Sequence, residues 1–462
     1  MTSRLQKAVL LLLGAAAGVL LSLNFSAIAQ KDGARLPLPV EELRSFAEVF
    51  GAIKSNYVEP VEDKKLISEA INGMLTGLDP HSAYLDSDAY RELQVGTQGE
   101  FGGLGIEVGM EDGFVKVVSP IEDTPAFRAG IKSGDLIIRL DETPVKGMSL
   151  NDAVKRMRGK PKTAIKLTVL RKGETKPLVF TLVRDVIKVQ SVKSKIIEPG
   201  FGYLRVAQFQ EQTAENMVRH INNLYKDGPL KGLVLDLRND PGGLLNGAVG
   251  ISAAFLPSKS IVVTTDGRTE DAKRKYLAST EDYLRGGRDD YLKKLPAAVK
   301  TVPMVVLVNG GSASASEIVA GALQDHKRAL IMGTQTFGKG SVQTIMPLGN
   351  NTAIKLTTAR YYTPSGRSIQ AKGITPDIVV EEPGIDSRPH LREADLDKHL
   401  SNDKDKAAEA AKSAPAARPN GKPKGESGDE APTKPIEFGS EQDVQLTQAL
   451  NMLKGLQIIQ KN

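Results

Sequence analysis

The chain has 462 residues, 40% of them hydrophobic, which is enough to bury a large core and to form two or three domains. Lys and Arg number 61 against 55 Asp and Glu, and there is no tryptophan to stack on bases, so nucleic acid is not an expected partner. The absence of cysteine excludes disulfides, thiol catalysis and cysteine metal sites.

The N-terminus has the features of an export signal. Arg4 and Lys7 precede an apolar run over residues 8–23, and residues 27–29 (Ala-Ile-Ala) match the small-residue pattern of a signal-peptidase site. The run is shorter than the roughly 20 residues that span a bilayer, which favours a cleaved signal peptide over residues 1–29. Removing Arg4 and Lys7 lowers the net charge from +6 to +4. We expect a periplasmic protein, associated with the inner membrane only if the signal stays uncleaved.

An N-terminal helical region is expected over residues 40–93. Apolar residues recur at helical intervals in residues 41–57 and again in residues 63–75, which predicts two amphipathic helices. Their apolar faces need a partner, which is either the chain's own core or another subunit.

Residues 98–185 change character and predict a small β-rich module. Short alternating strands are expected at residues 114–118 and 165–169, and a helix at residues 149–157. Their order, after a glycine-rich start, resembles a PDZ domain.

In PDZ domains a Gly-Leu-Gly loop presents backbone N–H groups to the terminal carboxylate of a peptide, and the next strand pairs with that peptide. The resemblance implies that this loop comprises Gly103, Leu104, Gly105 and Ile106. The alternative is a glycine turn that only lets the backbone bend. A dinucleotide-binding fingerprint is not matched, because Val108 stands where its third glycine belongs.

Apolar strands alternate with helices over residues 186–382, which predicts an α/β core with a mostly buried sheet. Strands are expected at residues 203–209, 232–237, 303–308 and 329–332, with helices at 213–225 and after Ser314. The highly charged residues 266–297 are interpreted as a surface insertion.

The end of the chain is expected to contain little structure. Residues 383–437 are rich in Lys, Glu, Ala and Pro, which predicts a disordered linker. Residues 438–462 follow as a C-terminal helix that is expected to dock on another surface, such as that of a second subunit. The fold class is therefore α/β and multidomain, with an inserted PDZ-like domain, an N-terminal helical region and a C-terminal helix.

Ser314 lies where an apolar strand passes into a helix, so it is either a helix cap or a nucleophile. Ser-x-x-Glu, ending at Glu317, is a capping box. Ser312 and Ser316 have equal claims as caps, and periodicity does not choose among the three. A serine nucleophile needs a base. The five histidines fall in no triad spacing and form no His-Glu-x-x-His, which leaves both a histidine base and a zinc hydrolase unsupported.

Lys339 is the candidate base. A lysine serves only if its pKa falls from about 10.4 toward 7 or 8, which burial can achieve, and few charged residues flank it. One alternative is an exposed loop lysine. Another is the phosphate loop of nucleotide hydrolases, but Gly340 stands where that motif needs Ser or Thr.

Three ordered motifs carry a wider resemblance. They are Leu-Asp-Leu-Arg-Asn-Asp-Pro-Gly-Gly (235–243), Gly-Ser-Ala-Ser-Ala-Ser-Glu (311–317) and Phe-Gly-Lys-Gly-Ser-Val-Gln (337–343). Together with the signal, the paired helices and the PDZ-like module, they resemble the carboxyl-terminal processing, or tail-specific, proteases of peptidase family S41. The match covers roughly residues 40–380.

The resemblance implies the roles of five residues. Ser314 corresponds to the nucleophile of this family, Lys339 to its base, and Gln343 to the residue that orients the lysine. The oxyanion hole is implied to be the backbone N–H groups of Ala315 and of a glycine in the Pro-Gly-Gly motif, for which Gly242 is preferred. The family uses no metal and no cofactor.

Three polar residues near these motifs are given structural roles. Glu317 is placed where it can line the site, but its role as a helix cap suffices to explain it, so no chemistry is assigned to it. Asp236 and Arg238 are expected to shape the oxyanion loop.

The function implied is that of a serine endopeptidase that cleaves exported proteins at or near their C-termini, after its PDZ domain recognises the tail. Expected partners are protein substrates with extended C-terminal tails, an adaptor protein, and further copies of the chain bound through residues 41–75 and 441–459. The alternative is a non-catalytic PDZ scaffold on the same fold, against which the intact Ser314, Lys339 and Gln343 argue.

Overall fold

The computed structural model of the chain describes residues 39–121, 123–286, 289–381, 391–404, 439–440 and 442–460. The chain divides into two compact units, residues 1–70 and 71–462. The expected signal peptide lies outside the described residues. Within the described ranges, no helix combines the length and hydrophobicity needed to cross a membrane.

The first unit contains both predicted N-terminal helices, α2 (Val40–Asn56) and the beginning of α3 (Asp63–Thr76). No residue of α2 is buried. Its apolar side chains Leu43, Phe46 and Val49 are 48%, 47% and 59% exposed. The helical spacing was therefore a correct signal, and the apolar stripe of α2 is left uncovered.

The second unit begins with a short strand and a helix, β1 (Ala83–Leu85) and α4 (Ser87–Gln98). The PDZ-like module follows, with strand order β3-β4-β5-β7-β8 and β6 beside β5. Its elements are β3 (Ile106–Glu111), β4 (Phe114–Pro120), α5 (Pro125–Arg128), β5 (Leu136–Leu140), β6 (Thr143–Pro144), α6 (Leu150–Met157), β7 (Ala164–Leu170) and β8 (Leu178–Val183). The module has its own apolar core, which includes Val115, Val117 and Ile137, all fully buried.

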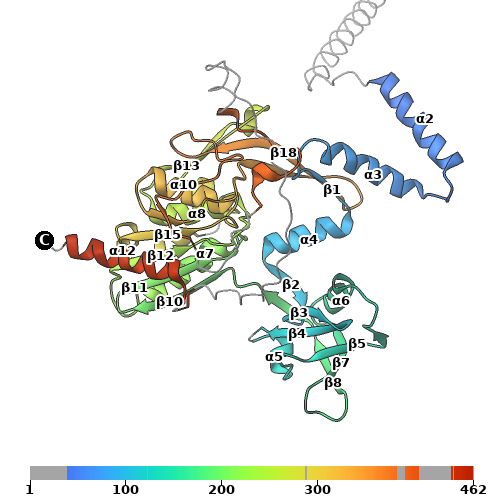
Figure 1. The fold of residues 1–462 in the computed structure, drawn as a ribbon, viewed down its shortest axis with the longest axis horizontal. Helices are drawn as coiled ribbons and strands as arrows, with labels where there is room; N and C mark the ends of the chain where they lie inside the picture. Colours follow the sequence, from blue (N-terminus) through green and yellow to red (C-terminus); the bar gives the residue numbers. More distant parts are fainter. Residues whose placement is uncertain are drawn as a thin grey trace, which may run out of the picture. The chain divides into compact units, whose positions relative to one another are not determined.

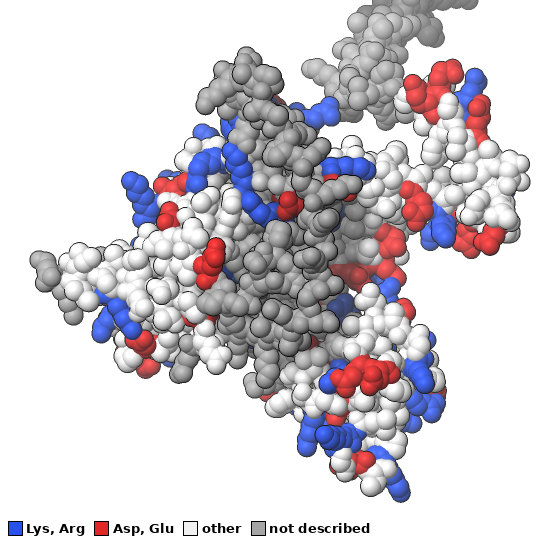
Figure 2. All heavy atoms as spheres, viewed as in Figure 1, with Lys and Arg blue, Asp and Glu red and all other residues white. Residues whose placement is uncertain are grey.

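Two strands flank the module in the sequence: β2 (Glu100–Gly103) precedes it and β9 (Asp185–Lys188) follows it. They pair with each other as an antiparallel ribbon. The strands of the module alternate buried and exposed residues, as a sheet with one solvated face requires. On the face of the molecule in Figure 2, acidic and basic side chains are interspersed over this module.

A six-stranded sheet organises the α/β core, in the order β10-β11-β12-β15-β16-β19. All its neighbours pair in parallel except β10 with β11. The strands are β10 (Val192–Glu198), β11 (Phe201–Val206), β12 (Gly232–Asp236), β15 (Met304–Val308), β16 (Leu330–Gly333) and β19 (Ile378–Val379). β11 ends three residues before the predicted position, because Phe209 instead forms an isolated bridge with Gly243.

Helices cover both faces of this sheet (Figure 1). α7 (Thr213–Leu224), α8 (Leu245–Phe255) and α10 (Ala315–Asp325) share one apolar core with Leu233 and Leu235 of β12. Val234 points to the opposite face, where the C-terminal helix α12 (Val444–Gln460) lies. This alternation explains the continuous apolar run of β12.

A second sheet contains β18 (Ala353–Tyr362), which pairs with β17 (Ser341–Pro347), β1 and β13 (Ile261–Gly267). β14 (Arg274–Leu277) pairs with β13 and completes the sheet. The interpretation of residues 266–297 as a surface insertion was therefore wrong in part. Tyr283 and Ala278 of this stretch are buried in the main core. The stretch also contains four short helical segments, which are η1 (Glu270–Ala272), α9 (Thr280–Tyr283), η2 (Tyr291–Lys294) and η3 (Ala297–Lys300).

The predicted linker is also partly ordered. Residues 391–404 are described and include the short helix η4 (Glu393–Asp395), in which Glu393 is fully buried. Polar anchors rather than an apolar pattern hold this segment, which is why the composition did not reveal it. Residues 382–390 and 405–438 lie outside the described residues.

The C-terminal helix docks on the chain's own core. Leu446, Leu450 and Leu453 of α12 are buried against the sheet face that carries Val234. The apolar face for which a second subunit was suggested as the docking surface is thus occupied within this chain.

Candidate active site

Ser314 lies in a strained turn between β15 and α10. Its backbone angles, φ 56° and ψ −112°, lie in a region that residues with a side chain rarely adopt. Such strain costs roughly 1–3 kcal/mol and persists only where the surroundings enforce it. A nucleophilic serine on a sharp strand-to-helix turn has this kind of geometry.

The structure distinguishes the three serines that periodicity could not separate. Ser312 is fully buried and its hydroxyl donates to the carbonyl of Leu237 at 2.8 Å. Ser316 is fully buried and its hydroxyl donates to the carbonyl of Asp240 at 2.9 Å. Ser314 alone of the three is partly exposed. The hydroxyls of Ser312 and Ser316 therefore hold the turn in place, whereas Ser314 is the one of the three that solvent can reach.

The loop after β12 packs directly against the Ser314 turn. A Cβ added to Gly242, whose φ is +93°, would lie 2.8 Å from both the nitrogen of Ala315 and the Cβ of Ser314. Only glycine fits so close an approach. The N–H of Gly242, however, donates to Oδ1 of Asp240 at 2.8 Å. Gly242 thus packs directly beside the Ser314 turn, with its N–H engaged inside the loop.

Glu317 joins the serine turn to the lysine loop. Its Oε2 accepts the backbone N–H of Ser314 at 2.8 Å, which is one half of the predicted capping box, and that of Lys339 at 2.9 Å. Its Oε1 accepts the N–H of Gly338 and the hydroxyl of Thr336. Burial raises the pKa of Glu317 to about 7, although the four donors act in the opposite direction. Glu317 therefore holds the lysine loop in addition to capping the helix.

Lys339 is desolvated, as a lysine base requires. Burial lowers its pKa from the ordinary 10.5, and the positive charge of Lys355 lowers it further. The negative charges of Glu393, Glu317 and Asp79 act in the opposite direction. The alternative of an exposed loop lysine does not hold.

Tyr361 of β18 contacts both candidate residues. It is 2% exposed, and its hydroxyl donates to the backbone carbonyl of Lys339. Burial raises its pKa well above 10, an effect that the neighbouring Ser314 hydroxyl reduces. Among the described residues, no hydrogen bond joins the Ser314 side chain to the Lys339 ammonium; the two are connected through Glu317 and Tyr361.

Gln343 does not contact Lys339 through a hydrogen bond within the described part of the chain. Its amide donates to Ser341 at 3.0 Å and to Thr357 at 3.3 Å. A bulge between Val342 and Gln343 interrupts β17, so the expected alternation that would place Lys339 and Gln343 on one side does not apply. Thr357 in turn donates to the buried Asp79 at 3.1 Å.

Glu393 and its partners were missed by the sequence analysis. Its carboxylate pairs with His81 at 2.8 Å and accepts the amide of Gln370, also at 2.8 Å. Gln370 accepts the N–H of Gly340, the residue after Lys339, at 2.9 Å. Polar residues from distant parts of the sequence therefore hold the lysine loop in place. No local sequence pattern predicts these contacts.

The four residues of the predicted peptide-binding loop lie at the entrance to β3. Leu104 is 3% exposed, and a Cβ on Gly105 would lie 2.3 Å from Thr124. Within the described residues, β3 pairs only with β4, which leaves its other edge open. An open edge is what strand addition by a peptide requires.

Within the described residues, no group of three or more His, Cys, Asp or Glu side chains is placed to hold a metal ion. The side chains gathered here are suited to proton transfer and hydrogen bonding.

Sequence comparisons show the family to which the chain belongs. Profiles described as peptidase family S41, PDZ domain, and N-terminal domain of the activating protease CtpB match residues 200–380, 102–182 and 14–89. A carboxy-terminal-processing protease of Bartonella bacilliformis is 49% identical over 371 residues, covering 79% of this chain and 82% of the relative. The chain belongs to the carboxy-terminal processing proteases of peptidase family S41.

Other S41 proteases are more distant. Carboxy-terminal processing protease CtpA of Bacillus subtilis is 35% identical over 80% of this chain and 74% of its own length. A solved photosystem II D1 C-terminal processing protease is 30% identical, covers 77% of this chain and 92% of its own, and has a TM-score of 0.42. The S41 chain described here is thus a serine-type peptidase with a PDZ domain.

Proposed function

We propose that this S41 protease cleaves peptide bonds with Ser314 as nucleophile and neutral Lys339 as general base. The observation that carries the proposal is the shared Oε2 of Glu317, which ties the strained serine turn and the desolvated lysine loop into one unit. A serine hydroxyl needs such a base, and a lysine base needs such burial.

The reaction follows from these groups. Nζ of Lys339 takes the proton of the Ser314 hydroxyl as Oγ attacks the substrate carbonyl. The lysine then gives this proton to the leaving amine, which departs and leaves an ester on Ser314. A water then loses a proton to Lys339 as its oxygen attacks the ester carbonyl, and Lys339 returns this proton to Oγ of Ser314 as the new C-terminus is released. The hydrogen bond from Ser314 to Lys339 forms in the substrate complex, as catalytic hydrogen bonds often do.

Charge on the carbonyl oxygen is stabilised by the N–H of Ala315 and by the loop of Gly242. The close packing of Gly242 on Ala315 supports this assignment. The Gly242 N–H is available to substrate once it leaves Asp240. Gln343 orients Lys339 through β17, because its amide holds Ser341 at the beginning of that strand.

The test compares the full-length chain with Ser314→Ala and Lys339→Met on β-casein and on unfolded exported proteins. Both variants are expected to lose cleavage while keeping the wild-type melting temperature within a few degrees. The exposed Ser258→Ala is the matched control and should cleave normally. Cleavage by Ser314→Ala at the wild-type rate would refute the mechanism.

We propose further that the loop of Gly103, Leu104, Gly105 and Ile106, together with the open edge of β3, binds the C-terminal tail of a protein substrate. Labelled tail peptides bound to the Ser314→Ala chain should give a higher fluorescence anisotropy with a free carboxylate than with a C-terminal amide. Equal binding of the two forms would argue against carboxylate capture.

The proposals on cellular location and partners rest on the N-terminal sequence, on the exposed face of α2 and on the family. The N-terminal signal supports periplasmic export, and the uncovered stripe of α2 supports homo-oligomer formation through the N-terminal helices. An adaptor protein is proposed on family resemblance alone. Labelling of Ser314 by a fluorophosphonate separates this protease from a non-catalytic PDZ scaffold, which would not react.

A further inference from the structure

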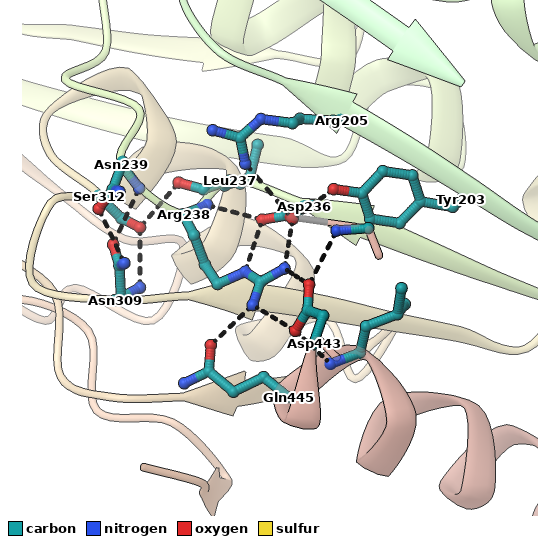
Figure 3. Close-up of polar contacts among 12 residues, drawn as sticks. Tyr203, Arg205, Asp236, Leu237, Arg238, Asn239, Asn309, Ser312, Asp443 and Gln445 are labelled. Carbon is teal, nitrogen blue, oxygen red and sulfur yellow. Dashed lines mark hydrogen bonds and ion pairs between the residues drawn. The ribbon is translucent and has the colours of Figure 1, made fainter. Parts of the chain in front are cut away.

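A buried arginine connects the C-terminal segment to the core (Figure 3). The Arg238 side chain is 0% exposed and uses all five of its N–H groups. Two bonds go to Asp236, at 3.0 and 2.7 Å, and two to Asp443, at 2.9 and 2.6 Å. The fifth goes to Gln445, at 2.9 Å.

The C-terminal side of this contact is built around Asp443. Its carboxylate accepts the backbone N–H of Leu446, at the beginning of α12, and that of Gly439. Gln445 donates its amide to the carbonyl of Val380, which follows β19. Asp443 is therefore both the cap of α12 and the partner of Arg238.

Docking of α12 does not need this ion pair. Leu446, Leu450 and Leu453 already bury an apolar face on the sheet. Because both charges must be desolvated, a buried ion pair adds little net stability, and its role is more often to fix a geometry. The geometry that Arg238 fixes is that of the loop it begins.

That loop supports the Ser314 turn on both sides. Just before Arg238, the carbonyl of Leu237 accepts the hydroxyl of Ser312. Two residues after it, the carbonyl of Asp240 accepts the N–H of Ala313 at 3.0 Å and the hydroxyl of Ser316 at 2.9 Å. Asn239 and Asn309 exchange two further hydrogen bonds, at 2.9 and 2.8 Å.

We propose that Asp443 is a positioning residue for the reaction, acting through Arg238 to hold the loop of residues 238–243 against the Ser314 turn. The C-terminal segment is then part of the catalytic centre rather than an appended anchor. This inference rests on the proposed serine mechanism, because the loop matters only if charge develops beside Ser314.

The test measures kcat and KM on fluorescent β-casein, and the rate of Ser314 labelling by a fluorophosphonate, in the full-length chain well below its melting temperature. Asp443→Asn keeps the size of the side chain but points an amide at the donors of Arg238. It should lower kcat and the labelling rate by roughly 10- to 100-fold with KM unchanged, as expected when a reacting group is displaced.

Lys454→Ala is the matched control. Lys454 pairs with Glu198 at 2.7 Å and anchors α12 at a different point of the sheet, away from Arg238. This variant should lower the melting temperature slightly and leave kcat unchanged. A structural role alone would make both variants lose stability without a change in kcat, which would overturn the proposal.

Gln445→Met covers the case in which Asp443→Asn does not fold. It removes one acceptor from Arg238 and should lower kcat by a smaller factor, whereas a wild-type kcat would again overturn the proposal. Ser314→Ala separates this inference from the mechanism. If Ser314→Ala is inactive while Asp443→Asn is as active as wild type, only the role of Asp443 is wrong.

Discussion

Ser314 and Lys339 donate their backbone N–H groups to the same carboxylate oxygen, Oε2 of Glu317, at 2.8 and 2.9 Å. The two residues come from different loops, one before α10 and one before β17. A single buried carboxylate therefore joins the loops of the proposed nucleophile and the proposed base. In the proposed mechanism, this contact is what allows a serine and a lysine 25 residues apart in the sequence to act together.

Replacing this carboxylate should separate the two loops. In Glu317→Gln an amide NH2 must face either Ser314 and Lys339 or Gly338 and Thr336, which leaves buried donors without an acceptor. Each such donor costs roughly 1–3 kcal/mol. We expect a lower melting temperature and a kcat reduced by about 100-fold at unchanged KM. A stable variant with wild-type kcat would show that Glu317 is only a cap.

The pH dependence of kcat/KM should report the deprotonation of Lys339. The acidic limb of the profile should lie below 10.5, because burial lowers the pKa of Lys339. Lys355→Met removes a positive neighbour and should move the limb to higher pH. Glu393→Gln removes a negative neighbour and should move it to lower pH, each by about one unit or less.

The other groups that face Lys339 are Glu317, Asp79 and Tyr361, and they stay unchanged in both variants. Shifts in the same direction for Lys355→Met and Glu393→Gln would contradict an assignment of the limb to Lys339. An unchanged profile in both would point to a different titrating base.

Periodic and motif signals predicted much of the fold. The apolar run of β12 and the helical spacing of the leucines in α12 depend on local burial, which a sequence pattern records directly. Ser314 and Lys339 were predicted as nucleophile and base from the family resemblance. The structure adds that the hydroxyls of Ser312 and Ser316 are buried and hydrogen-bonded, which distinguishes these two serines from Ser314.

Long-range polar contacts were not predictable in this way. Glu393 and His81 lie 312 residues apart, and Asp443 and Arg238 lie 205 apart, yet each pair is in direct contact. Such contacts have no period and arise only when the fold brings single side chains together. The same holds for the bulge before Gln343, which depends on pairing with β18.

Gly242 should not tolerate a side chain. A Cβ there would lie 2.6 Å from the carbonyl of Ala313 and 2.8 Å from the nitrogen of Ala315, in addition to the strain at φ +93°. Gly242→Ala should push the loop away from Ser314 and lower kcat by about 100-fold or more. Gly366→Ala is the control, because its φ of +82° carries similar strain with nothing within 4 Å. Equal kcat losses in both variants would remove Gly242 from the site.

Asp240 should make the stability of the chain depend on pH. Burial raises its pKa from 3.8 to about 7, so the folded chain holds the proton more tightly than the unfolded chain does. The stability from this site is therefore fully present below pH 4 and is lost as the pH rises through 7. Asp240→Asn removes this loss, and its melting temperature relative to wild type should increase from pH 5 to pH 8. The difference between a pKa of 3.8 and one of about 7 limits the change in the free energy of unfolding to about 4 kcal/mol. A constant difference in melting temperature between Asp240→Asn and wild type over this pH range would place the pKa of Asp240 outside it.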